Sequence, residues 1–142
     1  EKDASIPSYE PPSKDFETRA NEIVIHEFFD KNLPGVSFSG KDIAQETRNL
    51  INHFSKLASH LYSGSKVKLV LVGHSGIIEH FTKLVYLQNH PELTPEDVDT
   101  ETIGGLVSFG EGPEITIQSD NEGKQKIHLK FKNLDLAYES ER

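Results

Sequence analysis

Residues 66–78 read KVKLVLVGHSGII, and the expected fold depends on them. The first eight, 66–73, are rich in Val and Leu and nearly continuous in apolar character, which is typical of a strand covered on both faces. From Ile77 to Gln88, apolar side chains recur at helical spacing, so a helix is expected directly after the strand. A buried strand followed by a helix is typical of an α/β layer structure.

Two further helices are predicted before this strand. Apolar side chains fall at helical spacing from Phe16 onward, with Ser13 or Asp15 as the candidate N-cap. They do so again over residues 42–62, which follow a capping box at Ser39–Asp42. Residues 1–14 contain three prolines and few apolar side chains, so they are expected to form an extended or mobile leader. A single α/β domain, complete or part of a larger one, is then expected over residues 15–142.

The last third of the chain predicts a short helix near 95–99 and three strands. A glycine-interrupted strand is expected at 103–109. Residues 114–118 and 127–131 alternate between apolar and polar side chains, and the turn residues 119–124 connect them into a β-hairpin with one wet face. The expected fold class is therefore α/β: a layered sheet with flanking helices and a C-terminal β-hairpin.

Composition excludes several classes of protein. Fifteen Lys and Arg against 23 Asp and Glu give a net charge of −8, which argues against binding to nucleic acid or anionic membranes. The sequence has no Cys, so disulfides, thiolate zinc sites and a cysteine nucleophile are excluded. The longest apolar stretch is too short to span a bilayer, and no secretory signal opens the chain, so we expect a cytoplasmic protein. Because the sequence begins at Glu1 and contains no Met, we expect a processed chain or an excerpt from a longer one.

The corner between the predicted strand and helix holds the candidate binding residues. Strand ends in α/β sheets open onto the crevice where ligands bind, and a helix start presents unpaired N–H groups and a positive dipole end. We expect His74 to donate to, or exchange a proton with, a phosphate that the amides of Ser75 and Gly76 bind. The alternative is a tight turn at Gly73 and Gly76 in which His74 only caps the helix.

Two enzyme families have a signature at such a corner. In the α/β-hydrolases a G-x-S-x-G motif would make Ser75 the nucleophile of a serine esterase. Here the fifth position is Ile77, and too little chain follows Ser75 for a hydrolase of that class. The second signature fits better: residues 68–78 resemble the second histidine motif of the histidine phosphatase (phosphoglycerate mutase-like) superfamily, and the resemblance extends from Ser39 to Phe131.

This resemblance implies a phosphoglycerate mutase-like fold and phosphate chemistry. In that family two histidines face one phosphate, arginines complete the pocket, and an acid protonates the leaving oxygen. His74 matches the second histidine, which helps to hold the phosphoryl group. The first histidine, which becomes phosphorylated, belongs to an Arg-His-Gly motif that is absent here, so the resemblance covers the C-terminal half only. It implies phosphomonoester hydrolysis or phosphoryl transfer, without a metal or cofactor, if the nucleophile half is supplied elsewhere.

Arg48 is a further candidate ligand of the phosphate, and Glu46 a candidate acid, although two residues apart on a helix they point to different sides. His53 and His60 share a helix face, but a metal would need further ligands, so no metal site is expected.

The expected substrate is a phosphorylated small molecule or a phosphoprotein. A sheet without its first strand is expected to need a protein partner or self-association. The alternative function is a non-catalytic protein-interaction domain of the same fold.

Overall fold

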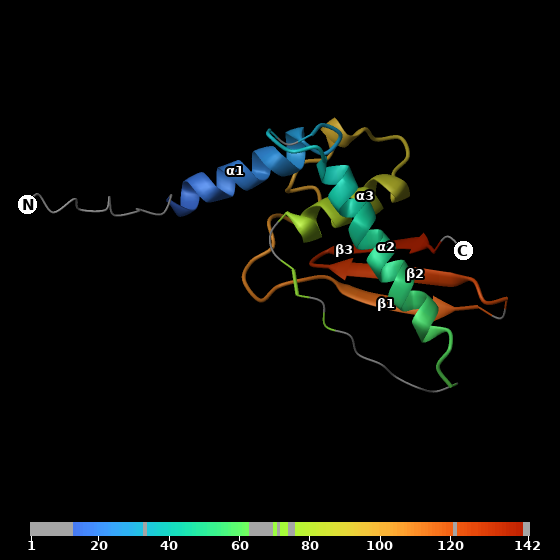
Figure 1. Cartoon of the computed structure of the whole chain (residues 1–142). Coiled ribbons are helices and arrows are strands. Elements are labelled where there is room, and N and C mark those ends of the chain that lie inside the picture. The colour runs from blue at the N-terminus through green and yellow to red at the C-terminus, as the bar shows by residue number, and fades with distance from the viewer. Residues whose placement is uncertain are drawn as a thin grey trace, which may run out of the picture.

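The chain forms helices in its first two thirds and an antiparallel sheet in its last third (Figure 1). The computed structural model describes residues 13–32, 34–62, 70, 72–73, 76–120 and 122–140. Within these ranges the structure is a mixed α/β fold with three α-helices and a three-stranded sheet. The elements are α1 (Lys14–Glu27), α2 (Gly40–Ala58), α3 (Ile77–Asn89), the 3₁₀ helix η1 (Pro95–Asp97), β1 (Glu114–Ser119), β2 (Gln125–Phe131) and β3 (Leu134–Glu139).

The helices begin where local sequence signals predict. Ser13 caps α1, because its hydroxyl accepts a hydrogen bond from the amide of Phe16 at 3.3 Å. The predicted capping box at α2 is confirmed: the Asp42 amide donates to the Ser39 hydroxyl at 3.2 Å, and the Ser39 amide donates to the Asp42 carboxylate at 2.7 Å. The Ser39 amide, and after it the Ser39 hydroxyl, lower the pKa of Asp42 by donating to its carboxylate. Helix α2 ends at Ala58, four residues before the predicted end.

The C-terminal hairpin is confirmed. β1 and β2 are antiparallel, with Ile115 opposite Leu129 and Ile117 opposite Ile127, so their apolar side chains share one face of the sheet. A third strand, β3, was not predicted; it pairs with β2 and places Tyr138 opposite Ile127. The strand order is β1-β2-β3.

The strand predicted at 103–109 is wrong. Residues 101–105 form turns, and residues 106–110 are also outside any strand. The reason is the backbone at Gly104 and Gly105, where φ is 96° and 84°, a region that no extended strand uses. The Lys132 ammonium donates a hydrogen bond to the carbonyl oxygen of Gly104 at 2.6 Å, and this contact stabilises the segment as a loop.

The described residues of the predicted strand 66–73 are also not in a strand. These residues are Val70, Val72 and Gly73, and the Val70 and Val72 side chains are 69% and 94% exposed, not covered on both faces. The described sheet is antiparallel and contains no strand that pairs with them. The remaining residues of this segment, and residues 1–12 of the expected leader, lie outside the described residues.

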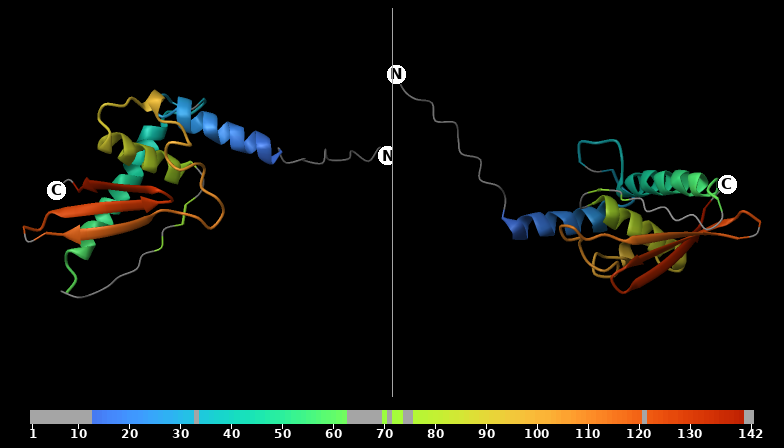
Figure 2. Two further views of the ribbon diagram at one scale, coloured as in Figure 1. Left: turned by 180° about the vertical axis from the view of Figure 1, so that it is seen from behind. Right: turned by 90° about the horizontal axis from the view of Figure 1, so that it is seen from below.

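Helix α3 lies at the centre of the packing. It packs against α2 and against β3, and every side chain from Glu79 to Val85 is buried. Helix α2 crosses the strands in Figure 1, and the view from behind in Figure 2 places the sheet in front of α2. The core between these elements contains Ile51, Phe81, Val85, Ile127, Leu129, Phe131, Leu136 and Tyr138. No helix in the described ranges is both long enough and apolar enough to cross a bilayer.

Candidate functional site

The predicted phosphate-binding corner is described in part. His74 and Ser75 lie outside the described residues, so their predicted roles stay predictions. Gly73 is exposed, and Gly76 is the N-cap residue of α3 with φ 97°. Because side chains rarely tolerate this backbone conformation, the helix start explains why residue 76 is glycine. The predicted helix start directly after Gly76 is confirmed.

The amide of Gly76 already donates a hydrogen bond to a carboxylate. The Gly76 N–H donates to one oxygen of Glu79 at 2.7 Å, and the N–H of Val107 donates to the other oxygen at 2.9 Å. Glu79 is only 1% exposed. A phosphate at this amide would have to displace a carboxylate that already has the same charge sign, so the role predicted for Gly76 depends on movement of Glu79. Sequence analysis did not identify Glu79, although it lies three residues after the N-cap, where capping-box acids occur.

The structure places Arg48 against the sheet. Its side chain is 8% exposed, and the guanidinium carbon lies 5.0 Å from the centre of the Tyr138 ring in β3. Burial raises the pKa of Tyr138 to about 12, and the charge of Arg48 opposes this shift. Arg48 therefore contributes to packing between α2 and β3, and its role as a phosphate ligand stays a prediction.

His80 is a buried titratable group that sequence analysis missed. Its side chain is fully buried, and neither ring nitrogen has a hydrogen-bond partner in the part of the chain that the structure describes. The ring packs so closely on Gly40, at the start of α2, that a Cβ there would overlap with it. Burial lowers the pKa of His80 to about 4; the charge of Lys83 acts in the same direction, and that of Glu79 opposes it.

Lys83 is buried one turn further along α3. Its ammonium donates to the carbonyl oxygen of Ile25 at 3.1 Å and lies 5.1 Å from the centre of the Phe29 ring. Burial lowers the pKa of Lys83 to about 8, and the negative charges of Asp30 and Asp99 oppose this shift. Both side chains on α3 are fully buried, so their burial contributes to the stability of the fold.

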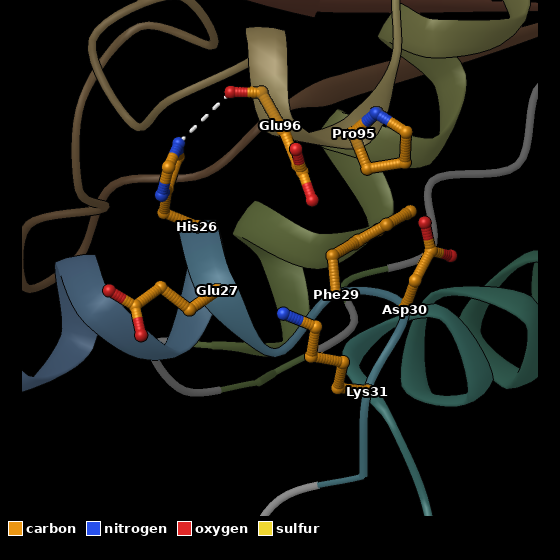
Figure 3. Close-up of a pocket in the computed structure, with 7 residues that line it drawn as sticks. All are labelled: His26, Glu27, Phe29, Asp30, Lys31, Pro95 and Glu96. Carbon is orange, nitrogen blue, oxygen red and sulfur yellow. Dashed lines mark hydrogen bonds between the residues drawn. The ribbon is translucent and has the colours of Figure 1, made fainter.

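A shallow pocket lies between the end of α1 and η1 (Figure 3). Its lining residues are His26, Glu27, Phe29, Asp30, Lys31, Pro95 and Glu96. A ring nitrogen of His26 forms a hydrogen bond with the carbonyl oxygen of Glu96 at 3.1 Å, which connects the two walls. Of the predicted site residues, Arg48 and Gly76 are described by the structure, and neither lines this pocket. In the described ranges, no group of three or more His, Asp or Glu side chains could hold a metal ion.

Comparisons of the chain with protein families, with characterised proteins and with solved structures find no match.

Proposed function

We propose that this chain is the second-histidine part of a phosphate-ester-handling domain of the histidine phosphatase type, with a phosphoglycerate mutase-like arrangement. The observation that supports it is the hydrogen bond from the Gly76 amide to a carboxylate oxygen. The amide at the start of α3 is thus oriented toward an anionic oxygen, directly after the His-Ser pair that resembles the family motif.

In this proposal each residue of the corner has a separate role. His74 donates to a phosphoryl oxygen, and the Ser75 amide binds a second one. The Gly76 amide becomes available only when the carboxylate of Glu79 moves away. The nucleophilic histidine comes from a segment outside this chain or from a partner, because the chain has no Arg-His pair. Phosphomonoester hydrolysis or phosphoryl transfer therefore requires that second part.

Inorganic phosphate should perturb the corner, and this is measurable by amide NMR of the chain. We expect the Gly73 and Gly76 signals to shift on titration and to saturate, because the phosphate binds beside both amides. His74→Ala should weaken this binding about tenfold or more, since it removes one charge-assisted or neutral donor. His60→Ala, at an exposed histidine just after α2, is the matched control and should bind as the natural chain does.

Two results would contradict the proposal. The first is the absence of any shift at Gly73 and Gly76 at millimolar phosphate. The second is hydrolysis of an aryl phosphate by the isolated chain that persists in His74→Ala, because a chain without the family nucleophile should be inactive alone. Labelling of Ser75 by a fluorophosphonate would instead support a serine esterase.

An apolar stripe on α2 favours a second candidate function, protein association. Leu50, Leu57 and Leu61 are 45%, 52% and 45% exposed and follow one another along one side of the helix and the turn after it. Val70 and Val72 are also exposed, at 69% and 94%. The protein partner or self-association expected from the sequence, like the cytoplasmic location, remains a prediction.

Self-association through this stripe is testable by sedimentation velocity at increasing protein concentration. We expect the natural chain to form a concentration-dependent oligomer, and the double variant Leu57→Ser, Leu61→Ser to shift it toward monomer, because each change removes exposed apolar area. Lys56→Ser is the control on the exposed side of α2. A natural chain that stays monomeric at all concentrations would exclude self-association and leave only a different partner.

A further inference from the structure

The two edges of the sheet differ in how their backbone groups are satisfied. β1 and β3 are the edge strands, on either side of β2 (Figure 1). On the β3 edge, the side-chain N–H of Asn89 donates to the Ala137 carbonyl oxygen at 2.8 Å, and the side-chain oxygen accepts from the Ala137 N–H at 3.4 Å. Asn89 therefore takes the place of a neighbouring strand at the centre of β3 and hinders the addition of another strand there.

The β1 edge has unpaired backbone groups. The Ser140 N–H donates to the Gln125 carbonyl oxygen at 3.0 Å, so Gln125 directs its backbone groups toward β3. Gln125 lies opposite Ser119 in β1. Because backbone groups point to alternate sides along a strand, Ser119, Ile117 and Ile115 direct theirs away from β2. Within the described ranges these groups form no backbone hydrogen bond, so β1 is open to an added strand.

The side chains of β1 do not protect this edge. Natural edge strands are often blocked by Lys or Pro, and residues 114–119 contain neither. Ile115 and Ile117 pack against the core between the sheet and the helices but are only partly buried. An added strand with apolar side chains opposite these two would cover them. The edge therefore fits an extended segment in which apolar and polar side chains alternate.

β1 is itself such a segment. In an antiparallel pair related by a two-fold axis at Thr116, Ile115 of one copy lies opposite Ile117 of the other, and the two exchange backbone hydrogen bonds. Glu114 then lies opposite Gln118 of the other copy. In this register the apolar side chains meet each other, and no acidic side chain of the strand faces another.

An axis one residue along the strand gives a poorer match. With the two-fold axis at Ile117, Glu114 would lie opposite Asp120 of the other copy, and like charges directly opposite each other are destabilising. Ile115 would lie opposite Ser119, so it would lose its apolar partner. The register centred on Thr116 is therefore the self-complementary one.

We propose that β1 is a homodimer interface, in which the β1 strands of two copies pair antiparallel about Thr116. The contact is separate from the candidate phosphate corner and from the apolar stripe on α2, and it does not depend on either. Each copy carries a net charge of −8, so the two copies repel each other at long range. Added salt screens this repulsion and should therefore tighten the dimer.

Disulfide trapping tests the register, because the natural chain has no Cys. In Thr116→Cys the two thiols lie in a facing pair without hydrogen bonds, whose Cα atoms are about 4.5 Å apart, within the range of a disulfide. With oxidised glutathione as the oxidant, we expect a covalent dimer on a non-reducing gel. Gln118→Cys is the matched control. Its two thiols lie four positions apart along the paired strands, about 14 Å, so it should cross-link about tenfold or more slowly than Thr116→Cys.

Sedimentation velocity with matched charge changes tests the contact itself. Thr116→Lys places two ammonium groups opposite each other and should weaken the dimer about fivefold. Gln118→Lys changes the net charge by the same amount but places each ammonium opposite Glu114 of the other copy, so it should tighten the dimer. Both positions are exposed on β1, so neither substitution should affect folding.

Three results would overturn the proposal. The first is a natural chain that stays monomeric at all protein and salt concentrations, which would leave the edge to a strand of another protein. The second is equal cross-linking of Thr116→Cys and Gln118→Cys, which would indicate random collision. The third is a dimer that Thr116→Lys leaves intact and the double variant Leu57→Ser, Leu61→Ser dissociates, which would assign the association to the stripe on α2.

Discussion

Acidification from pH 7 to pH 4 should lower the free energy of unfolding by about 3 kcal/mol through His80. The ring is fully buried, and its pKa falls from 6.5 to about 4 in the folded chain. Between these two values the unfolded chain binds a proton that the folded chain does not bind, so stability decreases as the pH falls through this window. Above pH 6.5 the contribution of His80 is constant.

Urea unfolding followed by circular dichroism at several pH values between 4 and 7.5 measures this effect. His80→Leu replaces the ring with an apolar side chain against Gly40 that cannot bind a proton. It should flatten the pH dependence of the free energy of unfolding, although packing differences change the absolute stability. His53→Gln, at an exposed histidine of α2, should leave the pH dependence as it is. Asp42, Asp97 and Asp99 have lowered pKa values and add a further loss near and below pH 4.

Direct titration of the His80 ring by NMR provides an independent check. A ring that titrates near 6.5 would contradict the burial that the structure shows. The prediction is also contradicted if the free energy of unfolding of His80→Leu falls on acidification as steeply as that of the natural chain. Because both measurements depend only on burial of the ring, they test the packing of α3 on α2 without reference to any ligand.

The parts of the fold that follow from the sequence are those determined by local signals. The cap at Ser13 and the capping box at Ser39 depend on side chains within three residues of the helix start, so they are readable in the chain itself. The β1–β2 hairpin alternates between apolar and polar side chains, and the intervening turn residues are polar. Each of these elements is therefore predictable without knowledge of its neighbours.

β3 was missed because the first residue of its turn is unusual. Lys132 adopts φ 52°, a conformation normally taken by Gly or Asn in two-residue hairpins, so Asn133 is the one residue of the pair that is typical of a tight turn. The strand itself is short, and its acidic end at Glu139 resembles a solvated tail. In the structure Glu139 forms an ion pair at 2.6 Å with Lys124, which directly precedes the neighbouring strand β2. Pairing with β2, a non-local contact, makes this segment a strand.

The backbone conformation of the candidate site was predictable from the sequence, but the positions of its charged and titratable side chains were not. The glycine at position 76 and the helix after it follow from the sequence. The positions of Glu79, His80 and Lys83 do not, because the apolar pattern of α3 suggests one buried side, whereas the structure buries the helix nearly all round. That burial results from the simultaneous packing of α2, the end of α1 and the sheet against α3, which no local window contains.

Glu79→Ala should lower the free energy of unfolding by about 3 to 5 kcal/mol, because it removes the acceptor of two partly buried amides. The side chain is 1% exposed, and both carboxylate oxygens accept, from Gly76 and from Val107. Urea unfolding at pH 7 measures the loss, and hydrogen exchange at the Val107 amide should accelerate with it. Glu79→Gln keeps one carbonyl acceptor and should lose about half as much.

Glu111→Gln is the matched control for this change. Glu111 accepts from a single amide in the same loop, that of Ser108, and this hydrogen bond is exposed, so the loss should stay below about 1 kcal/mol. Similar losses of unfolding free energy in Glu79→Gln and Glu111→Gln would contradict this prediction. They would show that the two hydrogen bonds to Glu79 stabilise the fold no more than one exposed hydrogen bond in a turn.

Glu79→Gln also separates stability from phosphate binding. If the carboxylate competes with phosphate for the Gly76 amide, the variant should be less stable and yet bind inorganic phosphate more tightly, because removal of the negative charge favours an anion at the start of α3. The two effects have opposite signs, so a general loosening of the fold cannot produce both. Weaker phosphate binding in Glu79→Gln, comparable to that of His74→Ala, would instead make Glu79 part of the binding arrangement and remove the competition from the proposed mechanism.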